Sequence, residues 1–264
     1  MEKFHHKNFD YVHQADGEYR SIEINELDGE KVFIKKYLHL NQFEIEEIFK
    51  KYCFFYKKLQ GTEIRIPKPM SFKENEIIFE FVDLPDARRS NNMMLEGGKI
   101  NIGVVERIAE ILVTVHNVGK QAGYNHGDFG YGNIFLFSNH VYVIDLEPPP
   151  PMQLEHKDVQ LLREKEFDMG VFLFSLFTLT DSTFAGYIKN LNKEHSAFLS
   201  FYTKCGGCYS NKKLKKIMLF LIKERYVRIL RGERTVWYKA PFHLILLTCQ
   251  IIINKQLRGS LITW

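Results

Sequence analysis

Three side chains, Asp128, Asn133 and Asp145, have the types and spacing that phosphate-transfer chemistry requires. Asp128 and Asn133 lie in the segment His-Gly-Asp-Phe-Gly-Tyr-Gly-Asn at 126–133, and Asp145 follows the apolar run at 141–144. A loop of the form His-x-Asp-x-x-x-x-Asn can hold a proton-accepting Asp together with a metal-binding Asn. An Asp at the end of the next hairpin supplies a second metal ligand. The ordered set therefore predicts a site that transfers a phosphoryl group.

Each of these residues has a distinct expected role. Asp128 is the candidate catalytic residue, which accepts the proton of an attacking hydroxyl or orients that hydroxyl. Asn133 offers a neutral oxygen to Mg²⁺ and Asp145 a charged one, and this ion prefers hard oxygen ligands. Gly130 and Gly132 ease the backbone so that the loop can curl around one pocket. The alternative interpretation is a glycine-rich surface turn beside an unrelated Asp.

Lys35 is the candidate ligand for a nucleotide. It ends the apolar run Val-Phe-Ile-Lys, and its neighbour Lys36 should point the opposite way on a strand. From this place Lys35 can reach the α- and β-phosphates and pair with a Glu of the following helix. That helix offers Glu44, Glu46 and Glu47. Glu47 is favoured, because Glu44 is expected to serve in the helix cap.

The first 83 residues are predicted to form a small, strand-rich lobe. Asp28-Gly29 is a hairpin turn signal. Apolar residues recur at helical spacing from Ile45 to Leu59, and Asn41 with Glu44 can form a capping box. We expect one helix at 41–59 and strands at 9–12, 19–24, 32–35, 70–72 and 77–82.

Residues 84–264 are predicted to form a larger, mainly helical lobe. The segment Asp-Leu-Pro-Asp at 83–86 is the expected linker. Apolar residues at helical spacing predict a helix that Gly119 ends, and the run at 167–179 predicts a buried helix. Asp168, a charge at the start of that buried helix, must be hydrogen-bonded and is expected to brace the catalytic loop. His126 is expected to pack and orient the same loop. The layout is α+β, with a cleft between two lobes.

Charge is distributed unevenly along the chain. The net charge is +4, but residues 204–264 carry +11, which leaves −7 for the rest by difference. This basic region predicts an anionic partner, either a membrane surface or a phosphorylated glycan, while a nucleic acid is not the expected partner. A solvated helix face is the alternative. The candidate contact residues are Lys212, Lys213, Lys215, Lys216, Arg225 and Arg228.

Neither a signal peptide nor a membrane span is expected. The first seven residues lack an apolar segment, and the longest apolar stretch, 242–253, is interrupted by polar residues and is short for a bilayer. We expect a cytoplasmic protein, with peripheral binding to the inner face of the membrane as an option. Cys205 and Cys208 have no second cysteine pair nearby, so free thiols are expected rather than zinc ligands.

These residues resemble the protein-kinase-like superfamily, nearest to its small-molecule branch. His-Gly-Asp at 126–128, then Asn133, then Ile-Asp-Leu-Glu at 144–147 is similar to the pattern of aminoglycoside phosphotransferases and lipopolysaccharide core kinases. In that branch an acidic residue often stands two places after the metal-binding Asp, as Glu147 does here. A protein kinase more often has Arg where Gly127 stands. The resemblance extends from about Tyr19 to Leu179.

The resemblance implies a two-lobed protein-kinase-like fold and an ATP- and Mg²⁺-dependent phosphotransferase. No G-x-G-x-x-G motif occurs near Gly17, so phosphate contacts are expected from another loop, through Arg20 and Ser21. The expected acceptor is a hydroxyl of a sugar or glycolipid, in a lipopolysaccharide or surface-glycan precursor. The alternatives are an atypical Ser/Thr protein kinase and a nucleotide-binding module that has kept the fold but not the reaction.

Overall fold

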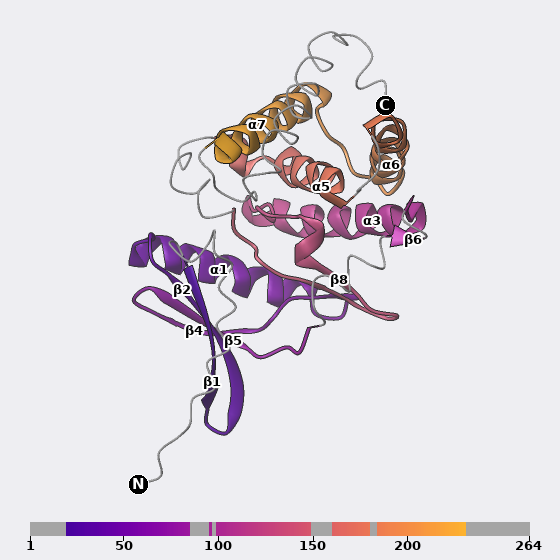
Figure 1. The fold of residues 1–264 in the computed structure, drawn as a ribbon. Coiled ribbons are helices and arrows are strands. Elements are labelled where there is room, and N and C mark those ends of the chain that lie inside the picture. The colour runs from indigo at the N-terminus through magenta and orange to yellow at the C-terminus, as the bar shows by residue number, and fades with distance from the viewer. Residues whose placement is uncertain (1–19, 85–94, 97–98, 149–159, 180–183, 231–264) are drawn as a thin grey trace.

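The computed structural model of the 264-residue chain describes residues 20–84, 95–96, 99–148, 160–179 and 184–230. Strands and helix α1 form one end of the molecule, and four helices (α3, α5, α6 and α7) form the other (Figure 1). This arrangement confirms the predicted α+β, two-lobed fold. The strand predicted at 9–12 and the second half of the predicted linker lie outside the described residues.

The N-terminal end is a four-stranded antiparallel sheet in the order β1-β2-β5-β4. Asp28 and Gly29, with φ of 52° and 83°, form the two-residue turn between its first two strands. Because that turn is so short, pairing continues up to it, and both strands are longer than predicted. The strands are β1 (Arg20–Leu27), β2 (Glu30–Tyr37), β4 (Pro69–Lys73) and β5 (Glu76–Glu80).

Helix α1 (Gln42–Leu59) packs against this sheet and confirms the predicted helix. The Asn41 side chain accepts a hydrogen bond from the Glu44 amide, and the Glu44 carboxylate accepts one from the Asn41 amide. The predicted capping box is therefore present. The buried side chains of α1 belong to the hydrophobic core that the helix shares with the sheet, and they are Ile45, Tyr52, Phe55 and Leu59.

A second, three-stranded sheet joins the two ends of the molecule. It has the order β3-β9-β8, and β3 (Ile64–Arg65) pairs in parallel with β9 (Val141–Val143). The antiparallel partner of β9 is β8 (Ile134–Leu136). Two residues are too few for a periodicity signal, so β3 could not be predicted from the sequence. The division of the chain at residue 83 stays a prediction, since this sheet crosses it.

Four helices make up most of the remaining described chain. They are α3 (Ile102–Gly119), α5 (Lys165–Leu179), α6 (Phe184–Lys204) and α7 (Asn211–Leu230). Within the described residues, none of the helices is both long and apolar enough to cross a membrane. Shorter elements are β6 (Leu95–Glu96), β7 (Lys99–Ile100) and the 3₁₀ turns η1 (Lys120–Ala122), η2 (Tyr131–Asn133) and η3 (Gln160–Arg163).

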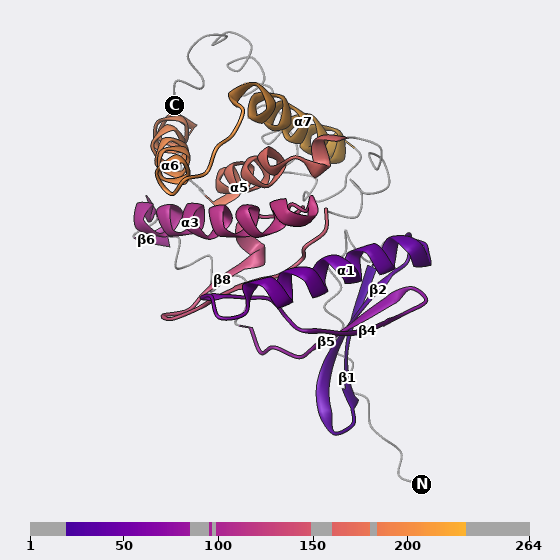
Figure 2. The ribbon, with the colours of Figure 1, turned by 180° about the vertical axis from the view of Figure 1, so that it is seen from behind.

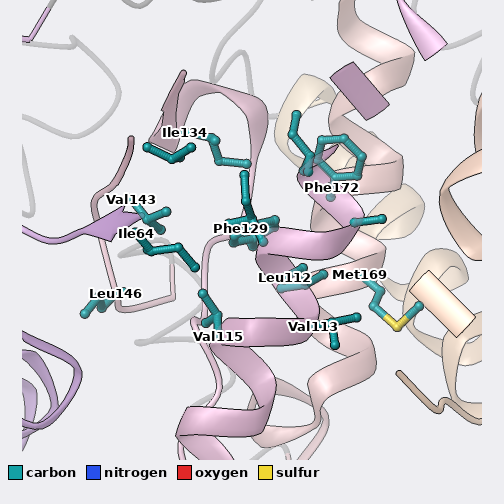
Figure 3. Close-up of a cluster of buried hydrophobic side chains, with 14 of the residues drawn as sticks. Ile64, Leu112, Val113, Val115, Phe129, Ile134, Val143, Leu146, Met169 and Phe172 are labelled. Atoms are coloured by element: carbon teal, nitrogen blue, oxygen red, sulfur yellow. The ribbon is translucent and has the colours of Figure 1, made fainter. Parts of the chain in front are cut away.

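Residues 126–145, called the catalytic segment below, lie between the sheet end and the helical end, as the front and back views both show (Figures 1 and 2). Phe129, which is 0% exposed, inserts into the hydrophobic core at this point. Figure 3 shows it among side chains from α3, α5 and the small sheet, including Leu112, Phe172 and Val143. Burial of this aromatic ring fixes the loop on both sides of it.

The capping box gives a first test of the fold. We expect Asn41→Ala to lower the free energy of unfolding by about 1 kcal/mol, because the Glu44 amide loses its acceptor. Chemical denaturation measures the change. Asn41→Asp keeps the acceptor and is the control, so equal losses in the two variants would contradict the capping role.

Candidate active site

The ammonium group of Lys35 is the centre of the candidate site. Lys35 is only 1% exposed, and its Nζ lies 2.9 Å from Asp145 Oδ1 and donates a second hydrogen bond to Glu147 Oε1. The Arg20 guanidinium donates to the other Asp145 oxygen at 3.3 Å. Strands β1 and β2 and the segment after β9 thus bring together three of the predicted residues, Arg20, Lys35 and Asp145.

The two cations control the charge of Asp145. Burial alone would raise its pKa, but the charges of Lys35 and Arg20, with the hydrogen bond from Lys35, hold the pKa well below the ordinary value. The carboxylate is therefore ionised at all physiological pH values. An ionised carboxylate beside two cations suits a site that exchanges these partners for metal and phosphate.

The predicted pair between Lys35 and Glu47 is not formed. Glu47 lies on the outer face of α1 with its side chain 46% exposed, and its carboxylate is 2.9 Å from Lys50 Nζ. Glu46 also pairs with Lys50, and Glu44 serves in the cap. The helical period turns Tyr52, not these carboxylates, toward the interior. Helix α1 therefore supplies no carboxylate to Lys35.

Glu147 takes the place that was predicted for a glutamate of the helix. It is 3% exposed, and its carboxylate accepts hydrogen bonds from the hydroxyls of Tyr37 at 3.0 Å and Tyr52 at 2.9 Å. Burial and the Glu147 charge raise the pKa of both tyrosines well above the ordinary value, so both hydroxyls stay protonated and donate. The acidic residue two places after Asp145 was visible in the sequence, but its partner was not.

Strand register separates Arg20 from Ser21. Arg20 pairs across the sheet with Tyr37, and Ser21 pairs with Lys36. Cross-strand partners share a face of the sheet, so Ser21 lies on the face opposite to Lys35. Lys36 confirms the alternation, because its Nζ pairs with Glu23 at 2.8 Å. The structure brings Arg20 to the site and does not bring Ser21.

The catalytic loop holds Asp128 and Asn133 in contact. The Asn133 side-chain amide donates to the Asp128 carbonyl at 2.8 Å and to Asp128 Oδ2 at 3.0 Å. The Ile144 amide donates to the Asn133 carbonyl at 3.0 Å, which ties the loop to the segment that carries Asp145. His126 is fully buried, and burial lowers its pKa to about 4. A neutral, packed ring fits the predicted orienting role.

Asp168 braces this loop as predicted. From the first turn of α5, its carboxylate accepts hydrogen bonds from the amides of His126 at 2.7 Å and Gly127 at 2.6 Å. His116 of α3 lies 3.0 Å away through Nε2. Burial would raise the pKa of Asp168, but the hydrogen bond and charge of His116, the charge of His126 and the Gly127 amide keep it below the ordinary value.

Gly127 explains how closely the two loops pack. Its φ is +100°, and a Cβ added there would lie 2.9 Å from the Pro148 nitrogen and 3.0 Å from the Glu147 carbonyl carbon. A larger residue has no room between the catalytic loop and the segment after Asp145. Asp145 itself has φ of 59°, an uncommon conformation in which Asp and Asn are enriched.

A mainly apolar pocket opens beside Lys35 and Asp145. Its walls come from β2, α1, β5, the chain on either side of the β4–β5 hairpin and the segment after β9, and they include the rings of Phe33, Tyr52 and Phe79. These walls draw on residues far apart in the sequence, so spacing could not reveal them. The lining residues are Phe33, Lys35, Tyr52, Pro67, Phe79, Glu80, Phe81, Val82, Leu84, Ile144 and Asp145.

Asp145 and Asn133 fit the predicted magnesium ligands. They offer one charged and one neutral oxygen, and Mg²⁺ usually takes one or two carboxylates from protein and the rest from phosphate and water. Both oxygens of each carboxylate accept hydrogen bonds, but the Asp145 side chain is 22% exposed and the Glu147 side chain only 2%. The greater access to Asp145 supports it rather than Glu147 as the metal ligand.

The six candidate contact residues of the basic region belong to α7. Lys212 and Lys216 are exposed, and Lys213 pairs with Glu164 at 2.8 Å. The side chains of Arg225 and Arg228 lie outside the described set. Neither Cys205 nor Cys208 forms a disulfide, and the hydrogen bond and charge of the Lys165 ammonium lower the pKa of Cys208. Anionic partners of this surface stay a prediction.

Comparison with known proteins identifies the family. The family model described as RIO domain matches residues 13–166, which span Lys35, both loops and Asp145. The chain belongs to the RIO domain family. This assignment confirms the protein-kinase-like superfamily that the motifs predicted.

Two other comparisons add little to this assignment. The crystal structure of the Mycobacterium tuberculosis PknI kinase domain is similar at 12% identity and a TM-score of 0.45, covering 71% of this chain and 90% of that chain. At these values the similarity adds nothing to the family assignment. No curated protein matches the chain.

The close approach at Gly127 gives a second test. We expect Gly127→Ala to lower the free energy of unfolding by about 2 kcal/mol or more, because of backbone strain and contact with residues 147–148. Thermal or chemical denaturation measures the loss. Gly132→Ala is the matched control, since a Cβ there meets nothing within 4 Å. Equal losses would refute the packing argument.

Acid titration gives a third test, on Asp168. Because its folded-state pKa is depressed, the stability it contributes is present above its unfolded pKa of about 3.9 and is lost as pH falls through the folded value. The difference in unfolding free energy between wild type and Asp168→Asn should therefore shrink in acid. A difference that stayed constant from pH 7 to pH 3 would argue against the depressed pKa.

Proposed function

We propose that this RIO-domain chain transfers the γ-phosphate of ATP to a hydroxyl group. The observation that carries the proposal is the buried Lys35, which is hydrogen-bonded to Asp145 in the wall of an apolar pocket. A lysine in that place is suited to the phosphates of a nucleotide whose base occupies the pocket. Family membership supports the same conclusion, because RIO domains are atypical protein kinases.

The pocket suits an adenine base. Phe33 and Ile144 line it together with the aromatic ring of Phe79, so a flat base meets apolar surfaces. The chain after β5 runs along the pocket through Phe81 and Val82. Backbone groups of this chain would hydrogen-bond the edge of a purine. The same contacts fit adenine and guanine, so the preference for ATP over GTP is inferred from the family alone.

Lys35 and Arg20 are the proposed phosphate ligands. Both now pair with Asp145, and incoming phosphate oxygens would take over these hydrogen bonds. Asn133 and Asp145 would hold magnesium, which supplies charge neutralisation across the phosphates when it is bound. A guanidinium on β1 provides a positive charge where a glycine-rich loop is missing. Catalysis is then mainly positioning and electrostatic stabilisation.

Asp128 is the proposed catalytic residue. Its carboxylate accepts a hydrogen bond from Asn133, and its amide donates to His126, so the side chain is held in one orientation. From there it orients the acceptor hydroxyl and takes its proton as the bond to phosphorus forms. Asp168 of α5 holds the same loop by accepting hydrogen bonds from two of its backbone amides.

A serine or threonine hydroxyl of a protein is the acceptor that the family favours. A sugar or glycolipid hydroxyl is the second candidate, and Gly127 is the observation that supports it. Protein kinases more often carry Arg at this position, and here the backbone of residues 147–148 fills the space that a side chain would need. A basic face on α7 would suit an acidic protein, a phosphorylated glycan or an anionic membrane equally.

Phosphate transfer from labelled Mg-ATP tests the proposal directly. Wild type should label an acceptor from a panel of casein-like proteins, small sugars and glycolipids. Asp128→Asn should lower the rate by at least about a hundredfold, since it removes the proton acceptor but keeps the shape. Thermal stabilisation by Mg-ATP should persist in the variant.

Each outcome on the panel has a distinct meaning. Labelling of protein alone identifies an atypical protein kinase, and labelling of sugar or glycolipid alone identifies a glycan kinase. Binding of Mg-ATP without transfer to any acceptor, including the chain itself, would contradict catalysis and leave a nucleotide-binding module.

A further inference from the structure

Two adjacent residues of α1 contact both loops of the candidate site. The Lys51 ammonium donates to the carbonyl of His126 in the catalytic loop at 2.9 Å. The Tyr52 hydroxyl donates to Glu147 Oε2 at 2.9 Å and accepts from the Leu146 amide at 3.0 Å. One turn of this helix therefore sets the position of the catalytic loop and of the segment that follows Asp145.

The Tyr52 hydroxyl is fully used in these contacts. The side chain is 3% exposed, and its ring packs edge-on against Phe79 with centroids 4.7 Å apart. A phenol offers one donor and accepts through its oxygen, and here both functions are engaged within the segment 146–147. Since the acceptor is a buried carboxylate, the donated bond is charge-assisted and stronger than a neutral one.

This tyrosine links α1 to Lys35. The glutamates of α1 lie in the cap or on Lys50, so none of them contacts the Lys35 ammonium. The link runs instead from Tyr52 to Glu147 and from Glu147 to Lys35. Tyr37 of β2 donates to Glu147 Oε1, the oxygen that Lys35 also contacts, while Tyr52 holds Oε2, so the carboxylate has little freedom to rotate.

We propose that Tyr52 is a positioning residue for the nucleotide, in that its hydroxyl orients Glu147 and Glu147 in turn orients Lys35. The proposal rests on the proposed function, because it concerns the phosphate-binding role of Lys35. It assigns to a phenol of α1 the task for which the sequence suggested a carboxylate of the same helix. A movement of α1 would then move Lys35, the Asp145 segment and the catalytic loop together.

The position of Glu147 adds a consequence for nucleotide binding. Glu147 and Asp145 belong to the same short segment, and Gly127 packs against its end. Loss of the Tyr52 hydroxyl therefore loosens the segment that carries both partners of Lys35. Lys35 itself remains, so the substitution should weaken ground-state binding of the nucleotide more than it slows the chemical step.

Tyr52→Phe is the variant that tests this role, because it removes one oxygen and keeps the ring against Phe79. We expect the Kd for Mg-ATP, measured by calorimetry, to rise about tenfold. The KM for ATP should rise with it while kcat changes little. Phe55→Leu is the matched control: it is buried on the same helix, one turn away, and has no polar group. It should lower Tm without changing the Kd.

Two further readouts separate positioning from simple destabilisation. Hydrogen exchange of the Leu146 amide in the nucleotide-free protein should be faster in Tyr52→Phe, since that amide loses its acceptor. In a double-mutant cycle with Glu147→Gln, the effects of the two substitutions on the Kd should be less than additive, because they act through one contact.

The outcomes distinguish this inference from the proposed function. If wild type binds Mg-ATP and transfers phosphate, but Tyr52→Phe keeps the wild-type Kd and KM, the positioning role is refuted and the kinase stands. Strictly additive effects with Glu147→Gln, or an equal rise in Kd for Phe55→Leu, would refute it as well. If wild type binds no nucleotide, the proposed function itself fails.

Discussion

A buried ammonium with two carboxylate partners organises this molecule. Lys35 is almost fully removed from water, and a charge in that place is tolerated only when it is paired and hydrogen-bonded. Asp145 and Glu147 supply the pairing, and they lie 110 and 112 residues after Lys35 in the sequence. Removing one partner of such a pair commonly costs about 3–5 kcal/mol. Folding of the sheet end and of the segment after β9 is therefore coupled through one side chain.

The loops around that charge are held by backbone contacts as much as by side chains. The Asp168 carboxylate accepts hydrogen bonds from two backbone amides of the catalytic loop. Phe129 is buried in the core, and Gly127 lets the catalytic loop contact residues 147–148. Where the loops meet, Gly127 has a positive φ that glycine adopts readily, and Asp145 has a positive φ that is uncommon for other residues. Strain of the kind at Asp145 is typical of functional sites and persists only where the surrounding structure determines it.

Local sequence signals predicted most of the fold, but only some of the contacts in the candidate site. The Asp28-Gly29 turn, the capping box at Asn41 and the apolar stripe of α1 act over a few residues, and the structure has them as predicted. Asp168 could be assigned because a buried charge must find partners. The partner of Lys35 could not be assigned, because Glu47 and Glu147 differ only in where the chain carries them in three dimensions. Ser21 was misplaced for a related reason, since one residue of strand register decides its face.

A structure of the protein with magnesium and a non-hydrolysable ATP analogue tests most directly whether the buried Lys35 binds the phosphates of a nucleotide. We expect the base in the pocket beside Phe33 and Phe79, the phosphates on Lys35 and Arg20, and the metal ion on Asp145 and Asn133, with Lys35 still bonded to Glu147. Phosphates bound away from Lys35, or a Lys35 that leaves Glu147 for a glutamate of α1, would contradict the account.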